Sequence, residues 1–459
     1  MDNLPEENTH QSYKKATVPS AKNTETNRVL IKAAIIACMI FILLIPSSLI
    51  SNLVKERAIR QDEVMKDVSS KWALPQTLNG PILMLPYIES KTDNNGNKIS
   101  TKKTAYFLPD KLNIDGNLQP QQRKRSIYSV ILYTSDLTLS GNFSKLDLAT
   151  LNINPENVIW TEAKLMIGIN DPGGIEDEAE LNWNGNSKNI ESTVTENNII
   201  GNGLVTNIAC NPTDNFNFRI QLKLKGSEYL YFTPAGKNTS VNIRSPWENP
   251  KFDGRYLATN NSTAKNGGFN SQWKIPQTAR PVPQAWTENH SNLSSYAFGV
   301  RLIQPIDTYA KTDRAVKYAL LFIGLSFTVF FFIEILQKHQ IHPLQYFLVG
   351  IALTVFYTLL LSLSEYIGFN TAYAIAVLAT VSLIGLYVWN IFKDSKIALG
   401  FTIALCALYG YIFFLIQLQD YALLFGSIGL FFVVALVMYS SRKVNWYQVG
   451  KKETNTSIA

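Results

Sequence analysis

Residues 33–53, AAIIACMIFILLIPSSLISNL, are almost entirely apolar and decide how the rest of the chain is organised. A helix of about 20 apolar residues is long enough to cross the hydrocarbon core of a bilayer. The polar segment before it is long for a cleavable signal peptide, and no A-x-A cleavage site follows. We therefore predict an uncleaved transmembrane helix over residues 29–54, preceded by a disordered tail over residues 1–28.

Five further apolar runs follow in the last third of the chain. Each is long enough to span a bilayer as a helix. They cover residues 315–336, 344–364, 371–392, 397–417 and 421–440. The chain is therefore expected to cross a membrane six times, once near its N-terminus and five times near its C-terminus.

The segment between these two membrane regions has a different pattern. Residues 55–74 have helical character and predict a stalk that extends the first helix. Beyond them the period becomes two: in FNFRIQLKLKG, residues 216–226, five apolar residues alternate with five polar ones. Such alternation is typical of a half-buried strand, and it recurs in other segments that are separated by turn residues. Residues 75–310 are therefore predicted to form an antiparallel sandwich or an open barrel.

These patterns predict an α+β membrane protein. It has one N-terminal transmembrane helix, a large antiparallel β-rich exported domain and a five-helix C-terminal transmembrane bundle over residues 315–440. A short tail, residues 441–459, ends the chain.

The positions of Lys and Arg predict the orientation in the membrane, because cytoplasmic loops carry an excess of these residues. The tail before the first span, the loops 337–343 and 392–396 and the C-terminal tail all contain Lys or Arg. The opposite short loops, EYIGFN at 365–370 and LQD at 418–420, contain neither. Both termini are therefore expected in the cytoplasm, and the β-rich domain on the other side.

Several functions find little support in the sequence. The net charge of +7 is spread over tails and loops, so no nucleic-acid partner is expected. The exported domain contains a single histidine, His290, and no H-E-x-x-H, G-x-S-x-G or C-x-x-C motif. We expect neither an enzyme activity, nor a cofactor, nor a metal site.

Polar residues at the ends of the predicted spans are the candidate site. Lys317 lies 23 residues before Gln340, in the loop between spans two and three, and Glu365 lies 25 residues after it. In an antiparallel hairpin their heights then differ by only about 3 Å. We expect Glu365 to pair with Arg314 or Lys317, with Asp313 nearby, at the outer membrane interface. A proton-handling acid is the alternative for Glu365.

Two further candidates lie toward the opposite ends of these helices. Glu334 comes late in the second span, and His342 immediately precedes Pro343 at the predicted start of the third. His339 and His342 are three residues apart and offer a metal pair as one alternative. Polar residues at the membrane interface are the interpretation that we prefer.

Residues 307–369 resemble the CreD family of Gram-negative inner-membrane proteins. The similar motifs are D-x-Y-x-x-T-D-R-A-x-K-Y-A at 307–319, H-P-x-Q-Y-x-L-V-G at 342–350 and L-S-E-x-x-G-F at 363–369. Glu334 stands where the family has an acidic residue. The resemblance implies a multi-pass protein of the bacterial inner membrane, connected with envelope integrity and stress responses. The exported domain would then be periplasmic.

The function expected from these observations is that of a non-enzymatic envelope protein. Its partners would be the lipid bilayer and an envelope protein or ligand that the β-rich domain meets. A transporter or flippase of an envelope component is one alternative, which a solute-dependent flux would favour. An enzyme acting on lipid or cell wall is another, and it would require a convergent polar site.

Overall fold

The computed structural model describes most of the chain in nine segments. They are residues 22–92, 98–190, 202–211, 215–263, 267–287, 293–302, 308–337, 340–418 and 421–442. The chain divides into two compact units. The helical unit is Met1–Arg57 with Asp307–Ala459, and the β unit is Ala58–Ile306.

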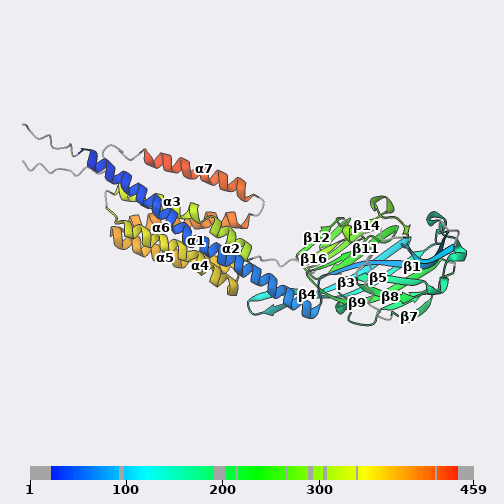
Figure 1. The fold of residues 1–459 in the computed structure, drawn as a ribbon. Helices are drawn as coiled ribbons and strands as arrows, with labels where there is room; N and C mark the ends of the chain where they lie inside the picture. The colour runs from blue at the N-terminus through cyan, green and yellow to red at the C-terminus, as the bar shows by residue number, and fades with distance from the viewer. Residues whose placement is uncertain are drawn as a thin grey trace, which may run out of the picture. The chain divides into compact units, whose positions relative to one another are not determined.

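The first element is α1, Lys22–Trp72, a continuous helix of 51 residues with Pro46 inside it (Figure 1). It passes through the apolar stretch 33–53 and continues through the residues for which a stalk is predicted. Among the described residues six helices are long and apolar enough to cross a membrane, and α1 is the first of them.

The other five candidate spans confirm the predicted C-terminal set. They are α3 (Ala319–Leu336), α4 (Pro343–Ile367), α5 (Phe369–Phe392), α6 (Ser395–Gln417) and α7 (Ala422–Ser441). Helix α4 packs against α5, and α5 packs against α6 (Figure 1). The span predicted to begin at residue 315 begins at Ala319 instead. Residues Thr308–Lys317 form a separate helix, α2, whose lysine and arginine side chains make it too polar to belong to the apolar span.

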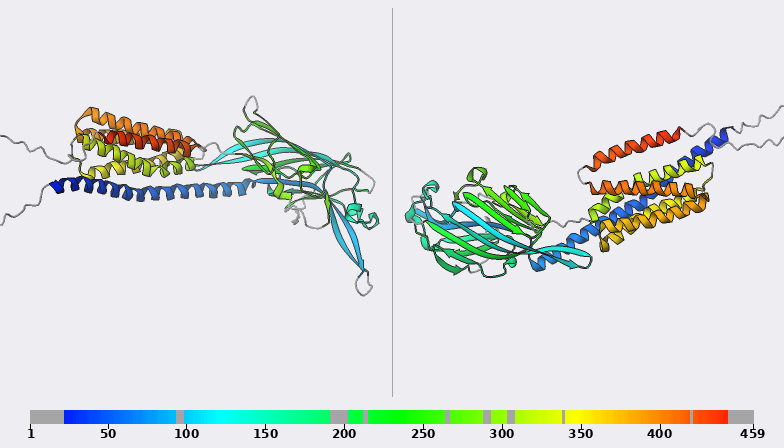
Figure 2. Two further views of the ribbon diagram at one scale, coloured as in Figure 1. Left: turned by 90° about the horizontal axis from the view of Figure 1, so that it is seen from above. Right: turned by 180° about the vertical axis from the view of Figure 1, so that it is seen from behind.

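The described residues of the β unit form two eight-stranded sheets (Figures 1 and 2). The first has the order β12 (Pro250–Gly254), β16 (Phe298–Leu302), β10 (Tyr229–Phe232), β1 (Gln76–Thr92), β2 (Lys98–Phe107), β15 (Ala285–Trp286), with β5 (Lys164–Ile169) on β1 and β8 (Gly203–Asn207) on β5. The second has the order β13 (Asn260–Thr263), β14 (Phe269–Ile275), β11 (Asn238–Ser245), β3 (Lys111–Arg125), β4 (Tyr128–Phe143), β9 (Phe216–Ser227), β6 (Glu180–Trp183), β7 (Asn186–Asn189).

The predicted alternation is present in β9, where the apolar residues are buried and the polar ones between them exposed. The inward side chains of both sheets join one hydrophobic core. At its centre Trp273 is fully buried, with ring centroids of Phe252 and Phe298 each 5.8 Å away. Most strand pairs are antiparallel as predicted, but β1 pairs with β10, and β3 with β11, in parallel.

A bulge in β1 explains one glycine. The pairing of β1 with β5 shifts register between Asn79 and Ile82. Gly80, inside this shift, has φ +100°, a backbone conformation that side-chain-bearing residues rarely adopt. Glycine at this position therefore lets the buried strand change register without steric strain.

Candidate functional site

The first polar cluster of the helical unit surrounds Glu334. We define the Glu334 cluster as Lys32 of α1, Glu334 of α3, Ile341 just before α4 and Tyr346 of α4. Glu334 Oε1 accepts from Lys32 Nζ and from the Ile341 backbone N–H, the latter at 3.1 Å. Tyr346 donates its hydroxyl to Oε2 at 2.7 Å. Lys32 also donates to the Ile341 carbonyl at 2.5 Å.

These contacts compensate the buried carboxylate of Glu334. The Glu334 side chain is only 9% exposed, and burying a carboxylate costs several kcal/mol unless a counter-charge and hydrogen bonds compensate. Here one cation and two neutral donors converge on its two oxygens. The cluster thus joins α1 to the hairpin formed by α3 and α4.

His342 lies beside this cluster and ends the loop before α4. Its Nδ1 accepts from the Leu344 backbone N–H at 3.2 Å, while Gln345 Oε1 accepts from the His342 backbone N–H at 3.0 Å. These reciprocal bonds cap the first turn of α4, where Pro343 has no backbone N–H and so needs no acceptor. In the structure His342 is therefore a helix cap, and His339, its candidate metal partner, lies outside the described residues.

The second polar cluster surrounds Glu365. We define the Glu365 cluster as Arg57 of α1, Tyr309 of α2 and Glu365 of α4. Tyr309 donates its hydroxyl to Glu365 Oε1 at 3.1 Å, and Arg57 Nε lies 3.8 Å from the same oxygen. The Glu365 side chain is 10% exposed and that of Arg57 43%. Glu365 is therefore covered to the same extent as Glu334, but its contacts with the described residues are fewer and longer.

The prediction that Glu365 pairs with Arg314 or Lys317 is wrong in this structure. Lys317 pairs instead with Asp313, one helical turn away, at 2.6 Å, and Asp313 also accepts from Ser51 of α1 at 3.3 Å. Arg314 donates to the Ile416 carbonyl at 3.3 Å. Two side chains must lie at equal height to form a pair between helices, but equal height does not determine which way each side chain points. Within α2, Asp313 is the acid that pairs with Lys317.

Both clusters depend on cations of α1 that the sequence argument left out. Lys32 directly precedes the apolar stretch, and Arg57 follows it by four residues. Cations at both ends of a span are common enough to be read as orientation signals only. Lys32 faces Glu334 and Arg57 faces Glu365, and these pairings follow from the packing of α1 against the C-terminal helices.

The β unit has its own polar contacts at the end of α1. The indole of Trp72 contacts two cations, with Arg123 Cζ at 4.6 Å and Lys225 Nζ at 5.1 Å from the ring centroid. Its Nε1 donates to the Tyr133 carbonyl at 3.4 Å. Such cation–π contacts contribute about 0.5–1 kcal/mol each at exposed sites. They connect the last turn of α1 with strands β3, β4 and β9.

One buried cation of the β unit was not expected. Arg280 is 4% exposed, and its Nη2 donates to Gln284 Oε1 at 2.6 Å, whereas Nε and Nη1 have no hydrogen-bond partner within the described residues. Removal from water lowers the pKa of the Arg280 guanidinium. Nothing in the sequence around it distinguishes Arg280 from a surface arginine.

The architecture and the two clusters define a class, that of a multi-pass membrane protein with a large β unit inserted after its first span. A family model described as "Inner membrane protein CreD" matches residues 28–447. The chain belongs to the CreD family, and it is an inner-membrane protein by that membership.

A curated relative and a solved structure differ in how similar they are to this chain. The chain is 32% identical over 417 residues to the inner membrane protein CreD of Escherichia coli strain K12, covering 89% of this chain and 91% of that one. A solved structure described as a candidate nutrient-binding protein from Legionella pneumophila aligns with 48% of this chain and 77% of its own. Its identity is 6% and its TM-score 0.25, too low to carry an argument.

Proposed function

We propose that this protein is a non-enzymatic component of the inner membrane that supports envelope integrity. Its termini are cytoplasmic and its β unit is a periplasmic interaction module. The main support for this orientation is the distribution of Lys and Arg. Loops 365–370 and 418–420 lack both residue types, whereas the opposite loops contain them. The even number of candidate spans among the described residues supports only a common side for the two termini, since it returns the C-terminus to the side of the N-terminus.

Enzyme fusions test the orientation. Alkaline phosphatase is active only after export, so a fusion after Thr101 should be active and one after Val444 inactive. A fluorescent protein that matures only in the cytoplasm, fused at the same two positions, should give the opposite pattern. Active phosphatase at Val444 with inactive enzyme at Thr101 would overturn the topology.

The β1–β2 hairpin supports the role of the β unit as an interaction module. It projects from the sheets as the blue pair of strands in the left view of Figure 2. Ile88 and Ile99, on its two strands, are 39% and 53% exposed. Two exposed β-branched apolar side chains on a projecting hairpin are suited to contact a partner by apolar burial.

Crosslinking in cells tests this surface. A photoreactive amino acid at Ile99 of the full-length chain should form a defined adduct with an envelope component. The same amino acid at Gln221, an exposed position of β9, is the matched control. Equal adduct yield at both positions, or none at Ile99, would reject the hairpin as the interaction surface.

A further inference from the structure

A groove lies in the seam between α1 and α4. Leu43, Ile50 and Arg57 are seven residues apart on α1, as are Ile351, Thr358 and Glu365 on α4. Residues seven apart return almost to the same face of a helix. The groove and the Arg57–Glu365 pair therefore belong to one continuous seam of the helical unit.

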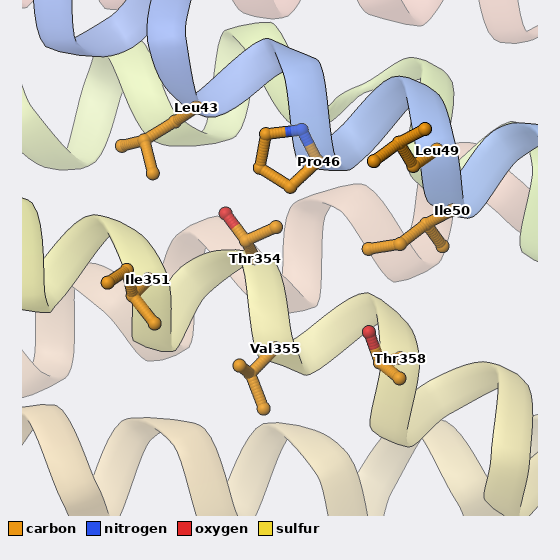
Figure 3. Close-up of a pocket in the computed structure, with 8 residues that line it drawn as sticks. All are labelled: Leu43, Pro46, Leu49, Ile50, Ile351, Thr354, Val355 and Thr358. Carbon is orange, nitrogen blue, oxygen red and sulfur yellow. The ribbon is translucent and has the colours of Figure 1, made fainter.

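Small side chains create the groove. Pro46 and Thr354 face each other across it, and neither reaches far enough to fill the space between the helices (Figure 3). The groove encloses about 340 Å³. Its lining consists of Leu43, Pro46, Leu49, Ile50, Ile351, Thr354, Val355 and Thr358.

The Leu43 side chain fills the seam beside Gly350. A Cβ atom added to Gly350 would lie 2.2 Å from Leu43 Cδ1, so this side chain packs directly on the α4 backbone at that point. Residue 43 is also the midpoint of the apolar stretch 33–53. The groove thus extends from the middle of the span toward Arg57, over roughly 10 Å of helix between Leu43 and Ile50.

The chemistry of the lining selects an apolar occupant. No lining side chain is charged, and the Thr354 hydroxyl already donates to the Gly350 carbonyl at 2.9 Å. Leu49 and Val355, at the mouth, are 63% and 46% exposed, so the groove is continuous with the apolar surface that contacts the bilayer. An empty groove would forfeit dispersion contacts, and water would find few hydrogen-bonding groups there.

We propose that the groove binds one acyl chain of a bilayer phospholipid from the leaflet at the Arg57 end. The chain enters at that end, and its methyl end lies against Leu43. The lipid phosphate lies near Arg57, whose cationic side chain is 43% exposed. Because lipid tails are as apolar as the groove, retention depends on packing of the chain and on this charged contact, not on the hydrophobic effect.

Photolabelling of the full-length protein tests the proposal. A phospholipid with a diazirine in its acyl chain is incorporated into the membrane, and the protein is transferred to detergent before illumination. We expect label on peptides containing residues 43–50 and 351–358 to survive the transfer. Val355→Trp, which narrows the groove, should lower this retained label several-fold. Ile375→Trp on α5, at a residue of nearly equal exposure (45%), should not.

Three further variants make the outcome decisive. Thr358→Leu fills the groove with a smaller change and replaces Val355→Trp if that variant does not accumulate. Arg57→Gln should lower lipid retention, whereas Glu365→Gln, which breaks the same ion pair but keeps the cation, should not. Label lost equally from the groove and from α5 would mean ordinary boundary lipid and overturn the proposal. A crosslink between Leu49 residues of two copies would overturn it also, since a second chain would then cover the groove.

Discussion

Glu334 and Glu365 are covered to nearly the same degree, with side chains 9% and 10% exposed, and each faces a cation of α1. Their contacts nevertheless differ. Glu334 accepts from an ammonium, a hydroxyl and a backbone amide. Within the described residues Glu365 has one hydrogen bond, from Tyr309, and an arginine at 3.8 Å. Equal burial thus does not mean equal stabilisation, because the number and distance of donors determine how well a charge is compensated.

The largest effect is expected for Glu334→Leu. The change leaves the Lys32 ammonium, 22% exposed, without its acid and should destabilise the packing of α1 by about 3–5 kcal/mol. Equilibrium unfolding of the purified full-length protein in mild detergent measures the loss. Lys32→Met in the same chain should recover much of it, since the uncompensated charge is then removed. If Glu334→Leu alone unfolds like the unmodified protein, the Glu334 cluster is not a stabilising contact.

An intermediate effect is expected for Gly350→Ala on α4. The added methyl group would lie 2.2 Å from Leu43 Cδ1 and 2.9 Å from Phe327 Cζ, so these two side chains must shift, at a cost of about 1–3 kcal/mol. Gly324→Ala on α3 is the control, because no atom lies within 4 Å of its added Cβ. The same unfolding assay compares the two. An equal response would show that α1 does not pack tightly at Gly350.

A smaller loss, about 1 kcal/mol, is expected for Glu365→Gln. Arg57 is partly exposed, so water can solvate the guanidinium when the acid is neutralised. A double-mutant cycle with Arg57→Gln should give a coupling free energy of similar size. A loss of function far greater than the loss of stability would instead favour the proton-handling alternative for Glu365.

The smallest effect is expected for Lys317→Met. The Lys317 side chain is 68% exposed and pairs with Asp313 within its own helix, so the free energy of unfolding should change by no more than about 0.5 kcal/mol. A charge-swap experiment distinguishes Arg57 from Lys317 as the partner of Glu365. Glu365→Arg should be rescued by Arg57→Glu, whereas Lys317→Glu should leave the defect unchanged. Rescue by Lys317→Glu would restore the pairing that the sequence suggested.

Much of the architecture could be predicted because it depends on local patterns. Six apolar runs predicted six candidate spans, and the alternation around residues 216–226 predicted a half-buried strand, β9. Hydrophobicity repeats at the period of each element and needs no knowledge of distant residues. The parallel pairing of β3 with β11 could not be read in this way, since it joins segments more than a hundred residues apart.

Local sequence patterns were thus sufficient to predict the number of candidate spans, the β-rich nature of the middle segment and the polar residues near the ends of helices. Which charges meet depends on how the helices pack. Height along a helix follows from residue counting, but the direction of a side chain and the choice of neighbouring helix follow from packing. Glu365 therefore faces Arg57 of α1, although residue counting assigns Lys317 a similar height, because α1 packs against α4 and α2 supplies Asp313 to Lys317.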